Sequence, residues 1–387
     1  MKILHTSDWH LGHMLYGYDR TEEQQSMLDQ MVEIVRDHKP DAFILAGDVY
    51  DTPQPSAAVQ TMLTKMIVAL HDVHPTMPII MTAGNHDSGS KHEIFRTPWE
   101  ALNVYAIGQL NKKHPETHII EIPGKGYILA IPYTHERNIP DGFFQLLLDI
   151  TAKSNTDQLP VFMTAHATIK GCDYAGHERA TEYIVGGIDT IDVEQIGQGY
   201  DYLALGHIHK PQFIHTGHHN VRYSGTPIAV SFDENYDHSV TMVEISHHDE
   251  KPVITTLPIT NLHPLVTLPT DGYASWEEAK ELLRNYPNDI PAYIRLNVQI
   301  DDFLPVDAKS EAIRIAESKQ CQFCHINAKR KCVNSSETST MTIQEFQSEP
   351  PIEIVKRYAD YIGIVFDEEM QEMFKQVEQM VQEATRK

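Results

Sequence analysis

Five apolar segments of this 387-residue chain each end in side chains of the kinds that bind divalent metal ions. These side chains belong to Asp8 and His10, Asp48, Asn85 and His86, His166, and His207 and His209. Taken singly, an aspartate in such a place is more often a turn residue or a helix cap, and a histidine more often a core or surface group. Their recurrence at five segment ends instead indicates one shared metal site.

The types of these residues narrow the chemistry. Carboxylate, amide and imidazole groups without cysteine favour Mn²⁺, Fe²⁺ or Zn²⁺ over a soft thiolate site. Eight residues are too many for one ion, even if one of them serves in catalysis, but they suit a pair. Two ions about 3.5–4 Å apart can hold the attacking and leaving oxygens of an in-line phosphoryl displacement. A carboxylate is the natural bridge, because it has two oxygens and offsets the repulsion between the cations.

The segments that carry these residues alternate with helical patterns in the first hundred residues. "KILHTSD", "DAFILAGD" and "PIIMTAGNHD" have the pattern of buried strands. The helix between the first two should bury Met27, Met31 and Val35, and Ser56 should cap the next helix. This alternation is typical of a parallel α/β sheet, in which ligands bind at the carboxyl ends of the strands.

Later segments extend this organisation. "GYILAIPY", "LPVFMTAHA" and "DYLALGHIH" repeat the apolar run with a polar end. Three strand-like runs between Val221 and Thr260 follow one another without a helix, which predicts a second, mainly antiparallel sheet. Beyond a seam at residues 260–269, we expect a small α+β unit, a polar linker and a helical tail. The predicted domains are residues 1–260, 261–335 and 345–387.

Composition argues against several classes of protein. The net charge is −23, from 31 Lys and Arg against 54 Asp and Glu, which disfavours a protein that coats DNA through a basic surface. No apolar run reaches the roughly 18 residues of a membrane span, and the N-terminus lacks a signal-peptide pattern. Four cysteines form no disulfide framework in a chain of this size. We therefore expect a cytoplasmic protein without a membrane partner.

The strand ends also match known motifs. "DWH", "GDVYD", "GNHD", "TAHA" and "GHIH" occur in this order, so the chain resembles the calcineurin-like metallophosphoesterase superfamily. With the more specific "HTSDWHLG" and "YSGTPIAVSFDE", it is similar to the nuclease subunits of bacterial SbcCD-type complexes. The resemblance implies an α+β fold: a metallophosphoesterase β-sandwich flanked by helices, a small α/β capping domain that contacts DNA, and C-terminal helices.

The resemblance further implies a role for each residue at the strand ends. One ion is expected on Asp8, His10 and His209, and the other on Asn85, His166 and His207, with Asp48 bridging both. His86 is expected to position the phosphate and to protonate the leaving oxygen, and Asp51 to orient His86. A plain turn role for Asp51 is equally open. The implied cofactor is a pair of Mn²⁺ ions, and the implied nucleophile is a metal-activated water.

The implied activity is Mn²⁺-dependent DNA cleavage, as a double-strand 3′–5′ exonuclease and a single-strand or hairpin endonuclease. The implied partners are DNA and an SbcC-type ATPase, with a homodimer of this chain inside a heterotetramer. Two alternatives are a metallophosphoesterase for nucleotides or phosphoproteins and a scaffold that has lost catalysis. Phosphoprotein phosphatases carry an arginine where this chain has Thr52, and scaffolds usually lack ligands, none of which is missing here.

Two features lie outside these motifs. Cys321, Cys324 and His325 have a haem-attachment spacing, and Cys332 lies nearby, but reduced and partly buried thiols are the favoured interpretation. In the tail, a methionine-rich apolar stripe follows Asp367, a predicted helix cap, and indicates a helix that binds a partner. The stripe consists of Met370, Met373, Phe374, Val377, Met380 and Val381. The alternative is that the stripe packs on the chain's own core.

Overall fold

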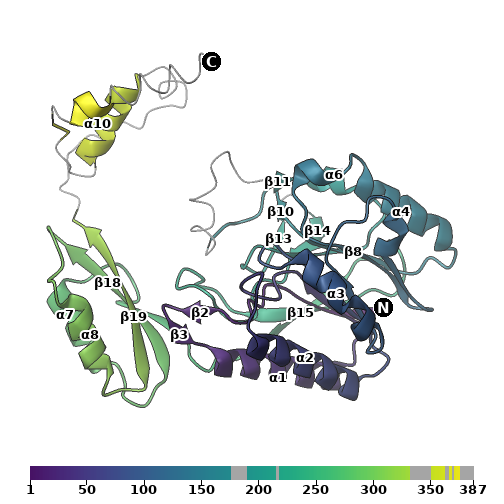
Figure 1. Cartoon of the computed structure of the whole chain (residues 1–387), viewed down its shortest axis with the longest axis horizontal. Coiled ribbons are helices and arrows are strands. Elements are labelled where there is room, and N and C mark those ends of the chain that lie inside the picture. Colours follow the sequence, from purple (N-terminus) through teal and green to yellow (C-terminus); the bar gives the residue numbers. More distant parts are fainter. Residues whose placement is uncertain (176–189, 215–217, 332–349, 362–365, 368–369, 375–387) are drawn as a thin grey trace. The chain divides into compact units, whose positions relative to one another are not determined.

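The computed structural model describes residues 1–175, 190–214, 218–331, 350–361, 366–367 and 370–374 (Figure 1). Cys332 and three residues of the predicted stripe, Val377, Met380 and Val381, lie outside the described residues. The chain divides into two compact units. The first comprises Met1–Thr267, Pro287–Arg295 and Ile313–His325, and the second Leu268–Tyr286, Leu296–Ala312 and Ile326–Lys387. The three-domain division at residues 260 and 335 remains a prediction.

The first unit contains a six-stranded sheet in the order β16-β15-β1-β4-β5-β6. Its strands are β1 (Lys2–Thr6), β4 (Ala42–Ala46), β5 (Ile79–Thr82), β6 (Val104–Ile107), β15 (Ser239–Glu244) and β16 (Val253–Pro258). The first four are parallel, as their alternation with helices predicts. β15 pairs antiparallel with the edge of β1, and β16 pairs antiparallel with β15.

A second six-stranded sheet has the order β13-β14-β12-β9-β8-β7. Its strands are β7 (Ile119–Ile122), β8 (Gly126–Ile131), β9 (Val161–His166), β12 (Tyr202–Gly206), β13 (Gln212–Ile214) and β14 (His218–Tyr223). The four central strands are parallel, and only β7 and β13 are antiparallel to their neighbours.

The prediction of a mainly antiparallel second sheet from residues 221–260 is therefore wrong. β14 pairs parallel with β12, while β15 and β16 belong to the first sheet. The local pattern correctly indicated that β15 and β16 follow each other as an antiparallel pair. The local pattern did not indicate that β1 has an open edge, whose main-chain N–H and C=O groups form hydrogen bonds with β15.

The two sheets face each other across an apolar layer that includes Ile3, Ile44, Ile128 and Phe162. Because successive strand residues point to opposite faces, Leu4 belongs instead to the outer layer under the helices. Helices α1 (Thr21–His38), α2 (Ala57–Val73) and α3 (Gly89–Glu100) flank the first sheet, and α4 (Phe143–Ser154) and α6 (Val193–Ile196) flank the second (Figure 1). The predicted β-sandwich flanked by helices is confirmed.

Local predictions for the first two helices are also confirmed. Met27, Met31 and Val35 of α1 are buried, and the Ser56 side chain accepts the Val59 N–H at the start of α2. The remaining short elements are β2 (Met14–Leu15), β3 (Tyr18–Asp19), β10 (Thr168–Ile169), β11 (Thr190–Ile191), η1 (Pro115–His118) and η2 (Glu136–Asn138). No helix in the described part of the chain is both long and apolar enough to cross a membrane.

In the described part of the C-terminal third, three strands form a sheet in the order β17-β18-β19, and helices lie between and after them in the sequence. These are β17 (Leu265–Leu268), β18 (Ala292–Ile300), β19 (Cys321–Arg330), α7 (Trp276–Asn285), α8 (Ala308–Ala316) and α10 (Pro351–Tyr361). Cys321 and Cys324 are free and buried. Since they are three residues apart on a strand, their side chains leave opposite faces and do not form one ligand group.

Candidate metal centre

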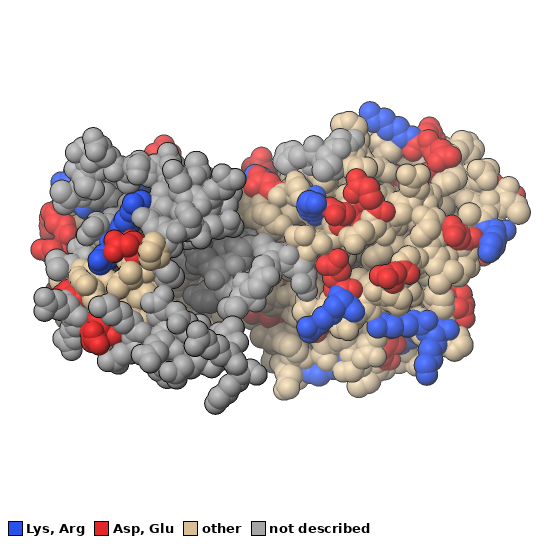
Figure 2. Space-filling model, turned by 90° about the horizontal axis from the view of Figure 1, so that it is seen from above, with Lys and Arg blue, Asp and Glu red and all other residues tan. Residues whose placement is uncertain are grey.

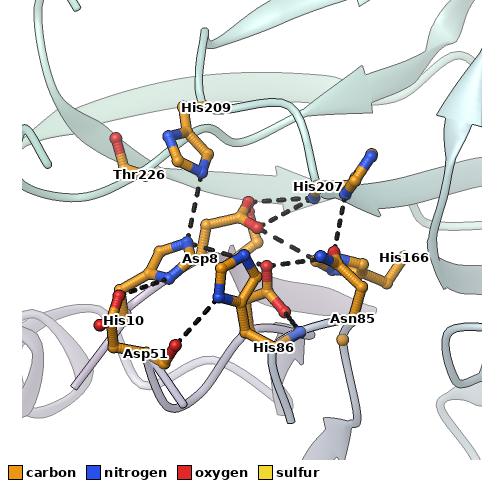
Figure 3. A network of polar contacts seen from close by, with 12 residues as sticks. Asp8, His10, Asp51, Asn85, His86, His166, His207, His209 and Thr226 are labelled. Carbon is orange, nitrogen blue, oxygen red and sulfur yellow. Dashed lines mark hydrogen bonds and ion pairs between the residues drawn. The ribbon is translucent and has the colours of Figure 1, made fainter. Parts of the chain in front are cut away.

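The predicted ligands come together at the carboxyl ends of β1, β4, β5, β9 and β12 (Figure 3). Each of the eight side chains or its backbone amide contacts another member of the set. Parallel strands bring their carboxyl ends to the same edge within each sheet. The edges of the two facing sheets meet at this cluster, so residues 199 positions apart in the chain contact each other here.

One ligand group consists of Asp8, His10 and His209, each with a donor atom within 4.8 Å of the others. The Nε2 atoms of His10 and His209 are 3.2 Å apart. Both histidines and Asp8 are buried. Three donors that converge from two different sheets in this way leave a position between them that suits a cation.

A second group consists of Asp48, His166 and His207. The Asn85 Oδ1 atom lies 2.9 Å from both His166 Nε2 and His207 Nδ1. Asp48 Oδ2 is 3.4 Å from His166 Nε2 and 3.7 Å from His10 Nε2, so one carboxylate oxygen faces both groups. A carboxylate oxygen in this position fits the bridging role that was expected of Asp48.

The backbone at these ligands is strained. Asp8, His10, Asp48 and His207 have φ angles of 54°, 44°, 48° and 96°, in the left-handed region that side chains disfavour. Such residues cost of the order of 1–3 kcal/mol each, and they persist where surrounding structure enforces them, commonly at functional sites.

Two glycines allow the strand ends to approach each other. A Cβ atom on Gly47 would lie 2.2 Å from His166 Nδ1, and one on Gly84 would lie 2.1 Å from Asp48 Oδ1. Any larger residue at either position would displace a ligand. In the "GD" and "GN" dipeptides of the motifs, Gly47 and Gly84 leave the space that the side chains of His166 and Asp48 occupy.

The electrostatics of the cluster fit a cation. Burial alone would lower the pKa of His10 and His166, but the surrounding carboxylates outweigh burial and raise both pKa values to about 9. Burial and the neighbouring His10 lower the pKa of His209 to about 3, so this ring is neutral and can offer a lone pair. Buried carboxylates need compensating positive charge, and Asp8 and Asp48 are 1% and 2% exposed. The residues present therefore fit divalent ions.

A separate group of potential ligands, Asp201, His248 and Asp249, lies elsewhere. Asp201 precedes β12 and so stands at the opposite end of that strand from His207. Its two carboxylate oxygens already accept the N–H groups of Val161 and Asp249, both at 2.6 Å. Asp201 thus links the segments that contain Val161 and Asp249 through hydrogen bonds. This group was not predicted from the sequence.

The sequence profile of the calcineurin-like phosphoesterase family matches residues 1–211, which contain every predicted ligand. The SbcD component of the nuclease SbcCD of Bacillus subtilis (strain 168) is 32% identical over 335 residues, which cover 79% of this chain and 81% of that protein. The chain belongs to the SbcD family of calcineurin-like phosphoesterases. Proteins of the same name from Rhodobacter capsulatus and Escherichia coli (strain K12) are each 29% identical, over 72% and 79% of this chain and 74% and 79% of their own lengths. Membership makes the chain a metal-dependent phosphoesterase.

The expected role of Asp51 needs correction in this SbcD-family site. His86 Nδ1 donates to the main-chain carbonyl of Asp51 at 2.9 Å, and not to its carboxylate. The Asp51 carboxylate lies instead 3.5 Å from His10 Nδ1. A carbonyl oxygen only accepts, so it still fixes the proton of His86 on Nδ1. The side chain of Asp51 thus contacts His10, a candidate ligand, while its backbone carbonyl contacts His86.

Two carboxylates that contact the candidate site or its loops were not predicted from the sequence. The buried Asp87 carboxylate accepts the N–H groups of Val49 at 3.1 Å, Tyr50 at 3.0 Å and Gly84 at 2.8 Å, which joins the loops after β4 and β5. Glu234 Oε1 lies 2.8 Å from His209 Nδ1. Asp87 is the last residue of "GNHD" and Glu234 is the last residue of "YSGTPIAVSFDE". The acidic residue at the end of each motif was the available signal in the sequence.

We expect chelator-treated protein to bind two Mn²⁺ ions per chain, because the structure presents two ligand groups that share Asp48. Isothermal titration calorimetry measures the stoichiometry. Asp201→Asn, in the group at the far end of β12, should still bind two ions. A stoichiometry of one for the unaltered chain would contradict the two-ion interpretation.

Proposed function

We propose that the chain is an Mn²⁺-dependent DNA nuclease that hydrolyses phosphodiester bonds with a water activated by two metal ions. The observation that carries this proposal is the pair of ligand groups on either side of Asp48 Oδ2. Two ions that share a carboxylate suit in-line displacement at phosphorus. The names of the SbcD relatives, which call them nucleases, support DNA as the substrate.

In this proposal, Asp8, His10 and His209 hold one ion, Asn85, His166 and His207 hold the other, and Asp48 bridges them. The chemistry that bound ions supply is a water of low pKa and neutralisation of the phosphate charge. The chain itself contributes the proton transfer. Because His86 Nδ1 is committed to the carbonyl of Asp51, its Nε2 remains to contact the phosphate and to protonate the leaving oxygen.

For so acidic a chain to bind DNA, positive charge must be concentrated on part of its surface or be supplied by a partner protein. The net charge is −23. On the face drawn in Figure 2, basic and acidic side chains of the described residues are interspersed and form no single basic patch. The exposed end of β19 carries Lys329 and Arg330, which supports residues 261–335 as a DNA-contacting segment. We propose that an SbcC-type ATPase supplies the remaining DNA-binding surface, in a heterotetramer with two copies of this chain.

The decisive experiment compares two substrates. Linear duplex DNA should be shortened from its 3′ ends, and hairpins opened, with Mn²⁺ and not with a chelator, while a phosphomonoester such as p-nitrophenyl phosphate should be hydrolysed poorly. The reason for the second expectation is Thr52, which stands where phosphoprotein phosphatases have a phosphate-gripping arginine. Efficient monoester hydrolysis without DNA cleavage would favour the phosphatase alternative, and activity on neither would favour a scaffold.

The C-terminal tail is proposed as the ATPase-binding segment. Asp367 accepts the Met370 N–H at 2.9 Å, as the predicted cap requires, and residues 370–374 include a helical stretch. Met370 and Met373 are the methionines of the predicted stripe that lie within the described residues. Their flexible thioether side chains suit a helix that docks into a partner's groove.

Deleting residues 345–387 should abolish co-purification with the ATPase and spare Mn²⁺-dependent cleavage, because every proposed ligand lies before residue 210. Pull-down with the ATPase and a nuclease assay measure the two properties. As a milder variant, Met370→Glu with Met373→Glu should weaken the same association. Unfolding or loss of metal in the truncated chain would assign the stripe to the core instead.

A further inference from the structure

A tight loop, residues 226–234, closes around the Glu234 carboxylate beside the metal centre. Glu234 Oε1 accepts from His209 Nδ1 at 2.8 Å, and Oε2 accepts from Thr226 Oγ1 at 3.0 Å and from the Val230 N–H at 3.3 Å. The Glu234 side chain is 0% exposed. With Nδ1 donating to this carboxylate, His209 presents the Nε2 lone pair to the proposed ion.

This 226–234 loop is held from outside by one arginine on β18. Arg295 Nη1 donates to Asp233 Oδ1 at 2.7 Å, and Nη2 donates to the Phe232 carbonyl at 3.2 Å. The guanidinium also lies over the Phe232 ring, 5.2 Å from its centroid, and Nε donates to Thr267 Oγ1 at 3.2 Å. The arginine side chain is only 12% exposed. A planar group held at three points is more strongly fixed than a surface ion pair.

We propose that Arg295 is a positioning residue for the metal centre. It fixes Phe232 and Asp233, their neighbour Glu234 is fixed with them, and Glu234 sets the tautomer and the direction of His209. The inference rests on the proposed two-metal function. It places a residue of β18, which is more than 80 positions from His209 and touches no ligand, in the control of metal affinity.

A purely architectural role makes a different prediction, and the chain offers a matched comparison. Tyr18 in β3 donates its hydroxyl to the Phe323 carbonyl of β19 at 2.8 Å. This contact also joins the N-terminal part of the first unit to the C-terminal strands, but it involves neither the 226–234 loop nor a ligand. Tyr18→Phe therefore removes a contact of the same architectural kind without disturbing Glu234.

The test is Mn²⁺ titration by calorimetry on the full chain, with four variants. Arg295→Ala should weaken the binding of one of the two ions about 10–100-fold and leave the other unchanged, as loss of an outer partner of a ligand does. Glu234→Gln should weaken the same ion. Arg295→Lys should fall between, because it keeps the charge opposite Asp233 but loses the planar fork. Tyr18→Phe should keep both affinities within about twofold.

The double variant Arg295→Ala with Glu234→Gln identifies the route. Residues that act through one another are not additive, so the double variant should bind no more than about twofold more weakly than Glu234→Gln alone. Fully additive losses would overturn the proposal, as would normal binding of both ions by Arg295→Ala. Unfolding of both Arg295 variants without metal, seen by circular dichroism, would assign the residue to the fold alone. Metal binding is measured without DNA, so the two proposals can fail separately. If the chain cleaves no DNA, the proposed nuclease function is refuted, but the calorimetry still tests the role of Arg295.

Discussion

Replacing Asp48 with asparagine should abolish Mn²⁺-dependent DNA cleavage and leave the fold intact. Asp48 Oδ2 is the atom that faces both ligand groups, 3.4 Å from His166 Nε2 and 3.7 Å from His10 Nε2. An asparagine would remove the negative charge that offsets two cations and would offer a weaker bridge. Removing one partner of a buried charged group costs about 3–5 kcal/mol, so a loss on the order of 10²–10⁴-fold is expected.

The same substitution should spare the structure, because the Oδ1 atom of an asparagine can still accept the His86 N–H, now accepted by Asp48 Oδ1 at 2.8 Å. Circular dichroism checks the fold, calorimetry counts the ions, and a linear-duplex assay measures cleavage. Asp201→Asn is the matched control, since Asp201 is a buried aspartate beside a histidine at the other end of β12. Retention of most activity by Asp48→Asn would refute the two-metal assignment.

The clustering of the candidate ligands could be predicted from the sequence, because the signal of each one is local. A buried strand is a short apolar run, and Asp48 or His166 at its end is read directly from the neighbouring letters. The common edge follows from the parallel order of the strands. The left-handed backbone of Asp8 and His10 could not be predicted, because neither residue type favours that conformation strongly enough to reveal it.

What the sequence could not reveal depends on partners far away in the chain. Glu234 is 25 residues from His209, and Asp87 is 38 residues from Val49. The sequence around either carboxylate therefore does not indicate its hydrogen-bond partner. The prediction that the Asp51 carboxylate orients His86 failed for another reason. His86 contacts the main-chain carbonyl of Asp51, and because every residue has such a carbonyl, no residue type indicates this contact. The edge position of β15 likewise depended on which strand had open main-chain groups.

His86→Ala should retain both Mn²⁺ ions and lose DNA cleavage by about 10²–10⁴-fold, the usual contribution of a general acid. His86 is anchored by its backbone N–H to Asp48 Oδ1 at 2.8 Å and by Nδ1 to the Asp51 carbonyl at 2.9 Å. The alanine keeps the first contact, so the bridging carboxylate stays in place. What disappears is the ring that positions the phosphate and donates a proton to the leaving oxygen.

The competing role for His86 is that of a ligand, since one of its ring nitrogens lies within 4.8 Å of donor atoms of His10 and Asp48. The two roles differ in a measurable way. A general acid can be removed without changing metal binding, whereas removal of a ligand weakens or eliminates one ion. Calorimetry on His86→Ala that shows one ion instead of two would make it a ligand. His114→Ala, which alters an exposed histidine that pairs with Glu116 of η1, should change neither binding nor cleavage. A substrate with a better leaving group should also partly restore cleavage by His86→Ala, because such a group needs less protonation, and a lost ligand would not be rescued in this way.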